Sequence, residues 1–174
     1  MRHFPTSFAV AVTLSALALP AFAADQPSDP QIAHIAYTAG DIDVKAGQLA
    51  LEKSQNKAVR AFASDMVRDH KAVNDKALAL VKKLNVTPED NGTSKALSDQ
   101  AAQKHDQLSK LSGAAFDKAY VENEVAFHKT VDGALETTLI PSSSNSELKG
   151  LLQTGLKIFQ GHLAHAEHLA STLK

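Results

Sequence analysis

Apolar residues recur at alternating steps of three and four along much of this chain, and this spacing limits the fold more than any other feature. One stripe runs along residues 57–84: Val59, Ala63, Met66, His70, Val73, Ala77, Leu80 and Leu84. A second runs along residues 146–173: Leu148, Leu152, Gly155, Phe159, His162, Ala166, Leu169 and Leu173. Such positions share one face of an α-helix. Both segments are predicted to be amphipathic helices, each with a single histidine in its apolar face.

Two more long helices are indicated by similar patterns. A helix that starts at Pro30, with Ser28 or Asp29 as its N-cap, has six inward positions: Ile32, Ile35, Ala39, Ile42, Ala46 and Leu49. A helix over 113–139 has six others: Phe116, Tyr120, Phe127, Val131, Ala134 and Leu135. A shorter and weaker pattern covers 94–111 and opens at Ser94. Polar turns are expected at 85–93 and at 140–145, where Ile140-Pro141 precedes a run of serines.

Four long amphipathic helices with short connections and no strand-like alternation predict an all-α fold, an antiparallel four-helix bundle. The segment 94–111 is expected to cross over or to extend one helix. Gly40 and Gly47 lie one heptad apart, and each would weaken an isolated helix by about 1 kcal/mol. We therefore expect both glycines to let a neighbouring helix approach closely.

The first 23 residues have the layout of a secretory signal peptide. A short basic region (Arg2, His3) precedes an apolar run over 8–19, and Pro20 is followed by the small-x-small cleavage signature of residues 21–23. An uncleaved membrane anchor is the alternative. It is less favoured because a spanning helix needs roughly 20 apolar residues.

Cleavage would leave a flexible lead-in at 24–29 and a bundle domain at 30–174, in the periplasm or secreted. Only Arg2 is lost among charged residues, so 17 Lys and Arg remain against 19 Asp and Glu, a formal net charge of −2. No basic stripe interleaved with aromatic residues is present, so nucleic acid is not an expected partner. No second apolar stretch could span a membrane as a helix. The chain has no cysteine, which excludes disulfides and thiolate metal sites.

Histidines form the one candidate site. His70 and His162 are the polar members of their stripes, and His128 lies beside the stripe of its own helix. Asp43 lies at the margin of the stripe on the first helix. A buried imidazole needs a partner for each ring nitrogen. These four side chains could satisfy one another as a structural network, or they could bind one ion of zinc, iron, copper or manganese.

Four further residues are considered either as alternative ligands or as residues that hold the ligands in position. Asp69 could hold an imidazole tautomer or face solvent, and we favour a supporting role. Glu124, one turn before His128, could be a ligand or only a helix-surface contact. Tyr120 is expected to be a core residue with its hydroxyl at the rim. His165 falls at the edge of the apolar arc, because a step of three residues rotates a side chain by about 60°.

Residues from about 30 to 173 resemble the exported bacterial proteins grouped as the DUF4142 domain family. The matching stretches are Gly47-Gln48-Leu49-Ala50, Val59 to His70, Leu111 to Val121, His128 and His162-Leu163. The resemblance implies export and a ferritin-like bundle, and it implies no established activity. The polar pattern of the family falls on Asp43 (where Glu is expected), Asp69, His70, Asp117, Tyr120, His128 and His162.

Three functions are consistent with these features. The leading hypothesis is a non-enzymatic envelope or stress protein whose histidines are structural or bind one metal ion. The second is a metal-dependent redox or peroxide-handling enzyme. It is weakened because the chain has no Glu-x-x-His, the motif that di-iron ferritin-like proteins carry in pairs. The third is a pH-responsive interaction module, since imidazoles titrate near pH 6.5. No nucleophile motif is present.

Overall fold

The computed structural model of the protein describes residues 26–173, and the predicted signal peptide at 1–23 lies outside them. The regular elements in this range are all helical: α1 (Asp29–Lys53), α2 (Lys57–Lys83), α3 (Gly92–Ser109), α4 (Gly113–Ala134), the π-helical turn η1 (Leu135–Leu139), α5 (Ile140–Ser142) and α6 (Ser146–Thr172). The predicted all-α class is confirmed. None of these helices is long and apolar enough to cross a membrane.

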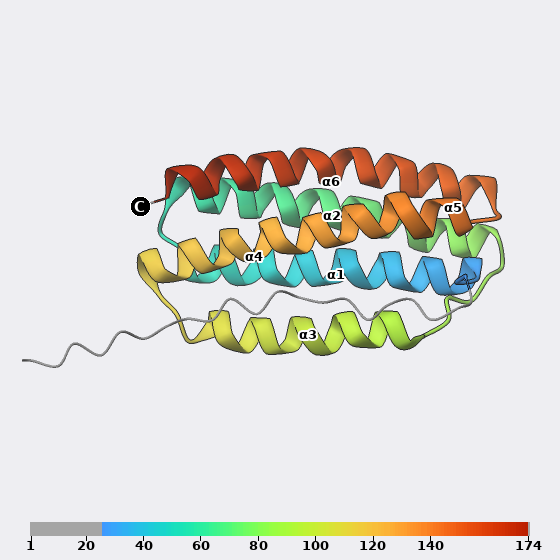
Figure 1. Cartoon of the computed structure of the whole chain (residues 1–174), viewed down its shortest axis with the longest axis horizontal. Helices are drawn as coiled ribbons and strands as arrows, with labels where there is room; N and C mark the ends of the chain where they lie inside the picture. Colours follow the sequence, from blue (N-terminus) through green and yellow to red (C-terminus); the bar gives the residue numbers. More distant parts are fainter. Residues whose placement is uncertain (1–25, 174) are drawn as a thin grey trace, which may run out of the picture.

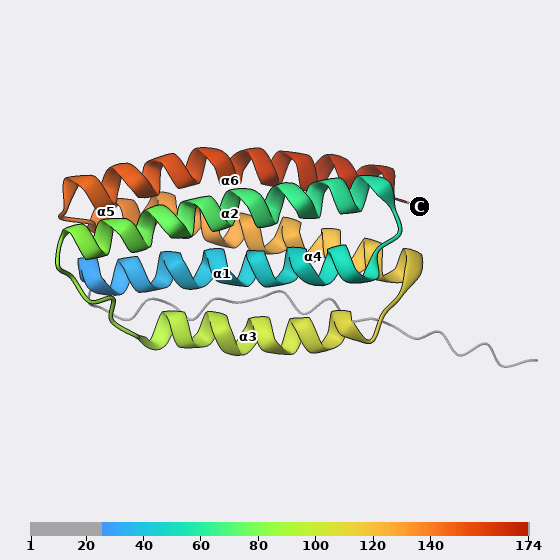
Figure 2. The same ribbon diagram turned by 180° about the vertical axis from the view of Figure 1, so that it is seen from behind.

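The long helices α1, α2, α4 and α6 pack around a common interior, and α3 lies outside them against α1 and α4 (Figures 1 and 2). α1 packs mainly on α2, while α6 contacts both α2 and α4. Neighbouring helices in this ring run in opposite directions, and α2 and α4 run in the same direction. This is possible because α3 carries the chain back along the outside. The segment expected at 94–111 is therefore a crossover helix.

Asparagine side chains fix where three of the helices begin. Asn56 and Asn145 each accept two backbone N–H groups from the first turns of α2 and α6. α3 begins at Gly92 and not at the predicted Ser94, because the side chain of Asn91 caps it. Ser94 instead accepts the backbone N–H of Asn91 at 3.1 Å. The reciprocal pair is a capping box, which places the cap three residues earlier than expected.

The helix that starts at Gly113 runs further than predicted. It continues through η1 and α5 to Ser142, where a turn at 140–145 was expected. Proline in a regular α-helix clashes with the carbonyl four residues earlier and lacks an N–H. Immediately before Pro141, the backbone N–H of Ile140 donates to the oxygen of Leu135, five residues back. This wider π-helical turn accommodates the ring, and the connection to α6 shortens to 143–145.

Gly40 and Gly47 lie where α1 packs against α2. A Cβ built on Gly47 would lie 2.8 Å from Cγ2 of Val67 and 3.1 Å from the backbone oxygen of Ala63. A Cβ built on Gly40 would collide with the buried side-chain amide of Asn74. A side chain at Gly47 would push the two helices apart, and one at Gly40 would displace the Asn74 side chain, so the predicted close approach at these glycines is confirmed.

A layer of polar side chains divides the core into two apolar clusters. One cluster includes Phe62, Phe116 and Leu169, and the other includes Ile32 and Leu152. Each long helix passes from one cluster to the other, and on each helix the change occurs at buried polar residues. These are Asp43 on α1, His70 on α2, Glu124 and His128 on α4, and His162 on α6. The four helices thus place these residues at one level of the bundle.

Candidate metal centre

The three buried histidines meet in the polar layer, and we call them the histidine cluster. One ring nitrogen from each of His70, His128 and His162 lies within 4.8 Å of the other two. Nδ1 of His162 is 3.3 Å from Nε2 of His70. The ring centroids are 5.1 to 5.8 Å apart, and no member is more than 7% exposed. Three helices therefore bring three imidazoles close enough to share one ion.

An oxygen acceptor fixes the proton on the outer nitrogen of two of the rings. Nδ1 of His128 lies 3.0 Å from the backbone oxygen of Glu124. A carbonyl oxygen only accepts, so this nitrogen carries the proton and donates it. Nε2 of His162 lies 3.1 Å from Oδ2 of Asp69. An ionised carboxylate also only accepts, which places the proton of His162 on Nε2 and leaves a lone pair on Nδ1.

The outer nitrogen of the third ring, that of His70, has a looser contact with its carboxylate neighbour. Nδ1 of His70 lies 3.4 Å from Oδ2 of Asp43, without the alignment of a hydrogen bond. Because Nδ1 of His162 carries a lone pair, Nε2 of His70 can donate to it at 3.3 Å, and a neutral His70 would then have its lone pair on Nδ1, next to Asp43. Nε2 of His128 is buried and has no hydrogen-bond partner. Nδ1 of His162 and Nε2 of His128 thus carry lone pairs, and Nε2 of His70 gains one when its proton moves to Nδ1.

Burial keeps the three rings neutral at pH 7. It lowers the pKa of His70 to about 2, with further lowering by His128 and His162, and it lowers the pKa of His128 to about 4. The pKa of His162 is also lowered, mainly by burial. With the proton of His70 on Nδ1, the lone pairs of His70 and His162 would face each other at 3.3 Å, and a cation between them would remove their repulsion. The geometry is therefore suited to binding a positive ion.

A second group of buried ligand atoms adjoins the histidine cluster and shares His128 with it. Asp43, Glu124 and His128 each offer one atom within 4.8 Å of the other two. Burial raises the pKa of Glu124 to about 8. Burial, followed by the charge of Glu124, raises the pKa of Asp43 well above its ordinary value. Both carboxylate oxygens of Glu124 lack a hydrogen-bond donor. A cation would stabilise the ionised form of both carboxyl groups.

Asp69 holds the outer nitrogen of His162 from the rim of the bundle. Its side chain is 26% exposed, and Nε and Nη2 of Arg68 donate to its two oxygens at 2.7 and 2.9 Å. These bonds lower the pKa of Asp69, chiefly through Arg68, so the carboxylate remains charged. The paired guanidinium also fixes the plane of the carboxylate. Asp69 is thus placed to orient the ring of His162 without being able to reach the lone-pair side of that ring.

The buried face of α4 is more polar than the sequence pattern predicted. It carries a residue every four positions: Tyr120, Glu124, His128 and Asp132. Three residues that were expected to face inward are only half-buried, since they lie to one side of this face: Phe127, Val131 and Ala134. Glu124 is an interior residue, so its interpretation as a helix-surface contact is wrong. Asp132 was missed, although its spacing of four residues from His128 was the available signal.

Asp43 and Tyr120 lie deeper in the bundle than expected. Asp43, expected at the margin of its stripe, is 2% exposed, because Ala39 and Gly47 on the same face leave space for it. The hydroxyl of Tyr120 was expected at the rim, but it is buried and has no hydrogen-bond partner. Burial raises the pKa of Tyr120, and the charges of Glu124 and Asp43 raise it further. The hydroxyl therefore lies on the side of the polar layer that contains Glu124 and Asp43.

His165, the remaining alternate, and Met66, a member of the α2 stripe, lie outside the site. His165 is exposed, and its ring packs edge-on against Phe62 at 5.1 Å between centroids. It therefore does not join the histidine cluster. The step of three residues from His162 turns it away from the interior. Met66 is fully buried among apolar side chains, in agreement with a packing role.

A family comparison covers both the helices and the polar layer. The model of the family described as "Domain of unknown function (DUF4142)" matches residues 15–169. The chain belongs to the DUF4142 family. The matched range includes every residue of the histidine cluster and its carboxylate neighbours, so the site lies within the DUF4142 domain itself. No curated protein matches the chain.

Two solved structures resemble this DUF4142 chain in fold. One is a candidate secreted DUF305 protein from Streptomyces coelicolor, with a TM-score of 0.67 and 9% identity, over 81% of this chain and 90% of that one. The other is a DUF305 fragment from Deinococcus radiodurans, with a TM-score of 0.68 and 17% identity, over 84% of this chain and 99% of that one. At these identities the likeness concerns the fold alone.

Proposed function

We propose that this DUF4142 protein is an exported, non-enzymatic helical bundle that holds one transition-metal ion between His70, His128 and His162. The observation that carries the proposal is the convergence of three neutral imidazoles in a buried layer. A carboxylate or carbonyl oxygen lies next to the outer nitrogen of each ring, so that nitrogen can hold the proton while the inner nitrogen donates its lone pair to an ion. Neutral imidazole with a free lone pair is the form that binds metal ions.

The spacing of two of these nitrogens supports an ion between them. Zinc–nitrogen bonds of about 2.0–2.1 Å at a tetrahedral angle place two nitrogens roughly 3.3–3.4 Å apart. Nδ1 of His162 and Nε2 of His70 are 3.3 Å apart. The pair therefore needs little rearrangement to bind a tetrahedral ion.

The carboxylates beside the cluster supply the opposite charge. A divalent ion in a water-excluding interior is costly unless it is paired. Asp43 and Glu124 are both buried, and together they can offset two positive charges. Glu124 or Asp43 would complete the ligand set beside the three imidazoles. A set dominated by imidazole favours zinc, copper or iron over manganese, which prefers oxygen ligands.

Burial and the predicted leader support the remaining parts of the proposal. Each residue of the cluster is at most 7% exposed, so a substrate of more than a few atoms could not touch the ion. This favours holding the ion over transforming a metabolite. Export is supported by the signal-peptide pattern of residues 1–23. An exported protein could bind metal in the cell envelope.

The test is the metal content of the protein purified from the periplasm without chelators. We expect elemental mass spectrometry to find about one metal ion per chain. His70→Ala and His162→Ala should each lose it, and His70→Phe should lose it while keeping the packing of an aromatic ring. His168→Ala is the matched control, because His168 is an exposed histidine on the same helix as His162.

Two results would contradict the proposal. The first is wild-type protein that holds no stoichiometric metal and gains no thermal stability from zinc, iron, copper or manganese. The second is an ion that remains in both alanine variants. Recovery of the full-length chain only in the cytoplasm, with residues 1–23 uncleaved, would overturn the export part alone.

A further inference from the structure

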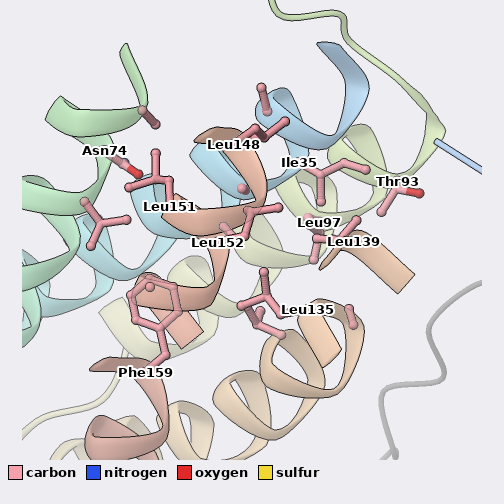
Figure 3. A pocket seen from close by; sticks show the side chains of 18 of the residues that line it. Ile35, Asn74, Thr93, Leu97, Leu135, Leu139, Leu148, Leu151, Leu152 and Phe159 are labelled. Carbon is pink, nitrogen blue, oxygen red and sulfur yellow. The ribbon is translucent and has the colours of Figure 1, made fainter. Parts of the chain in front are cut away.

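An apolar cavity of about 60 Å³ lies between α1, α2, α3, α4, η1 and α6, next to the polar layer (Figure 3). Leu135, Leu152 and Phe159 surround it, as Figure 3 shows. Small residues leave the space open, since Ala39 and Gly155 also line it. The wall is almost entirely apolar.

Water is a poor occupant for a cavity of this kind. A buried water usually makes about three hydrogen bonds, and apolar cavities of adequate size stay dry and bind xenon or small apolar molecules. A volume of about 60 Å³ suits a molecule of two or three heavy atoms more than a drug-sized ligand, whose pockets are several hundred Å³. The small volume and the apolar wall of the cavity therefore favour a small uncharged molecule as its occupant.

One aromatic ring separates this cavity from the histidine cluster. The ring of Phe159 lines the cavity and also stacks on the ring of His70, with centroids 4.4 Å apart and an interplanar angle of 5°. It meets the ring of His128 at 6.4 Å in an edge contact. An occupant of the cavity is thus one ring away from two of the three imidazoles.

We propose that the cavity binds an uncharged diatomic gas of the size of dioxygen, as a ligand held behind Phe159 for the metal centre. The part of this proposal in which the gas binds to the ion rests on the proposed function. Binding of the gas in the cavity does not depend on that function, because the cavity wall contains no residue of the histidine cluster. Rotation of the Phe159 ring would connect the two spaces.

Xenon tests the cavity without any metal. Crystals of the chelator-treated full chain under xenon pressure should show one xenon atom beside Phe159. Gly155→Ala should reduce its occupancy several-fold, since the added Cβ lies 3.4 Å from Cε2 of Phe159 and 3.7 Å from Cγ1 of Val73, contacts that cause no clash. Gly150→Ala is the matched control, because a Cβ there meets nothing within 4 Å. Both changes favour the helix by up to about 1 kcal/mol, so folding is preserved.

Nitric oxide then tests the link to the ion. In protein loaded with ferrous iron, the spectroscopic signal of the iron–nitrosyl complex should form several-fold more slowly in Gly155→Ala than in Gly150→Ala. A wild-type cavity that holds ordered water or no xenon would overturn the gas site. Equal nitric oxide rates in the two variants would overturn its role as a route to the ion. Xenon bound in a protein that takes up no metal would support the gas site and contradict the metal proposal.

Discussion

Nδ1 of His162 and Nε2 of His70 face each other at 3.3 Å across the contact between α6 and α2. The direction of the His162 lone pair is set on the far side of its ring, where Oδ2 of Asp69 lies 3.1 Å from Nε2. The proposed affinity of the cluster for an ion should therefore depend on Asp69, a residue that would not touch the ion. The partners of ligating histidines commonly have this effect.

Asp69→Ala should weaken metal binding while leaving all three imidazoles in place. Without the carboxylate, the proton of His162 is free to occupy Nδ1, and the ring loses its anchor. Loss of such a partner typically costs about 10–100-fold in affinity. The dissociation constant for zinc, measured by competition with a chromophoric chelator at pH 7, should rise by that amount.

Asp65→Ala is the control for this change. Asp65 also binds Arg68, at 2.6 Å from Nη1, but it makes no hydrogen bond to a histidine. Its removal should change the dissociation constant less than about threefold, the size of effect expected from an exposed ion pair. Equal weakening in the two variants would show that the charge near Arg68 matters and the contact with His162 does not.

The metal-free protein should lose stability as the pH rises from about 6.5 to 8. Burial raises the pKa of Glu124 from 4.5 to about 8, so the folded state keeps a proton that the unfolded state has already released. The folded state therefore binds more protons, and the free energy of unfolding falls with rising pH. Glu124 alone should contribute a loss of about 1–2 kcal/mol over this interval. The three buried histidines oppose part of this loss, because their unfolded forms are still about half-protonated at pH 6.5, and each should gain about 0.4 kcal/mol of stability by pH 8.

Glu124→Gln should flatten this slope in urea denaturation series at pH 6.5, 7.2 and 8, in the presence of a chelator. Glu122→Gln provides the comparison, since Glu122 is exposed on the same helix. A slope that persists unchanged in Glu124→Gln would assign the titration to another group, with Asp43 the next residue to replace.

The helices were predictable because each buries one apolar face against partners of similar pattern. The helical period alone was enough to predict the stripes through Met66 and Leu152, and the spacing of the α1 glycines was enough to predict their role. The end of α4 was not predictable in the same way. A proline normally stops a helix, and the π-helical turn that accommodates Pro141 depends on the packing of Leu135 and Leu139 in the second apolar cluster.

Most residues that converge in the polar layer could be predicted from the sequence, but the position of the proton on each imidazole ring could not. A single histidine in an apolar stripe marks an interior imidazole, and this located His70 and His162. The depth of Glu124 was left open because α4 has polar and apolar residues on adjoining faces, so the helical period fits either face. Which nitrogen carries the proton depends, for His70 and His162, on groups from other helices, and a sequence contains no information on such distances.

Tyr120→Phe should stabilise the metal-free protein by up to about 1 kcal/mol. The hydroxyl of Tyr120 is buried without a partner, and removing an unsatisfied buried polar group while keeping the ring recovers part of its desolvation cost. The aromatic contacts with Phe62 and Phe116 are retained. Thermal and urea unfolding in a chelator would measure the change. A loss of 1 kcal/mol or more would mean that the hydroxyl has a partner in solution, such as bound water next to Glu124.

Gly47→Ala should destabilise the protein even though alanine is the better helix former. Alanine favours an exposed helix position by about 1 kcal/mol. At Gly47 the new Cβ would lie 2.8 Å from Cγ2 of Val67 and 3.1 Å from the backbone oxygen of Ala63, which cannot move without shifting α2. Overpacking of this kind costs about 1–3 kcal/mol.

Gly133→Ala on α4 isolates the propensity effect, because a Cβ there meets nothing within 4 Å. Urea midpoints should therefore move in opposite directions, downward for Gly47→Ala and upward for Gly133→Ala, with similar denaturant slopes. Because Asp43 lies one turn before Gly47 on the same face, a shifted α1 should also weaken zinc binding in Gly47→Ala. A Gly47→Ala protein as stable as Gly133→Ala would show that the α1–α2 spacing is loose, and the ligand geometry across that contact would then have to be set by α4 and α6.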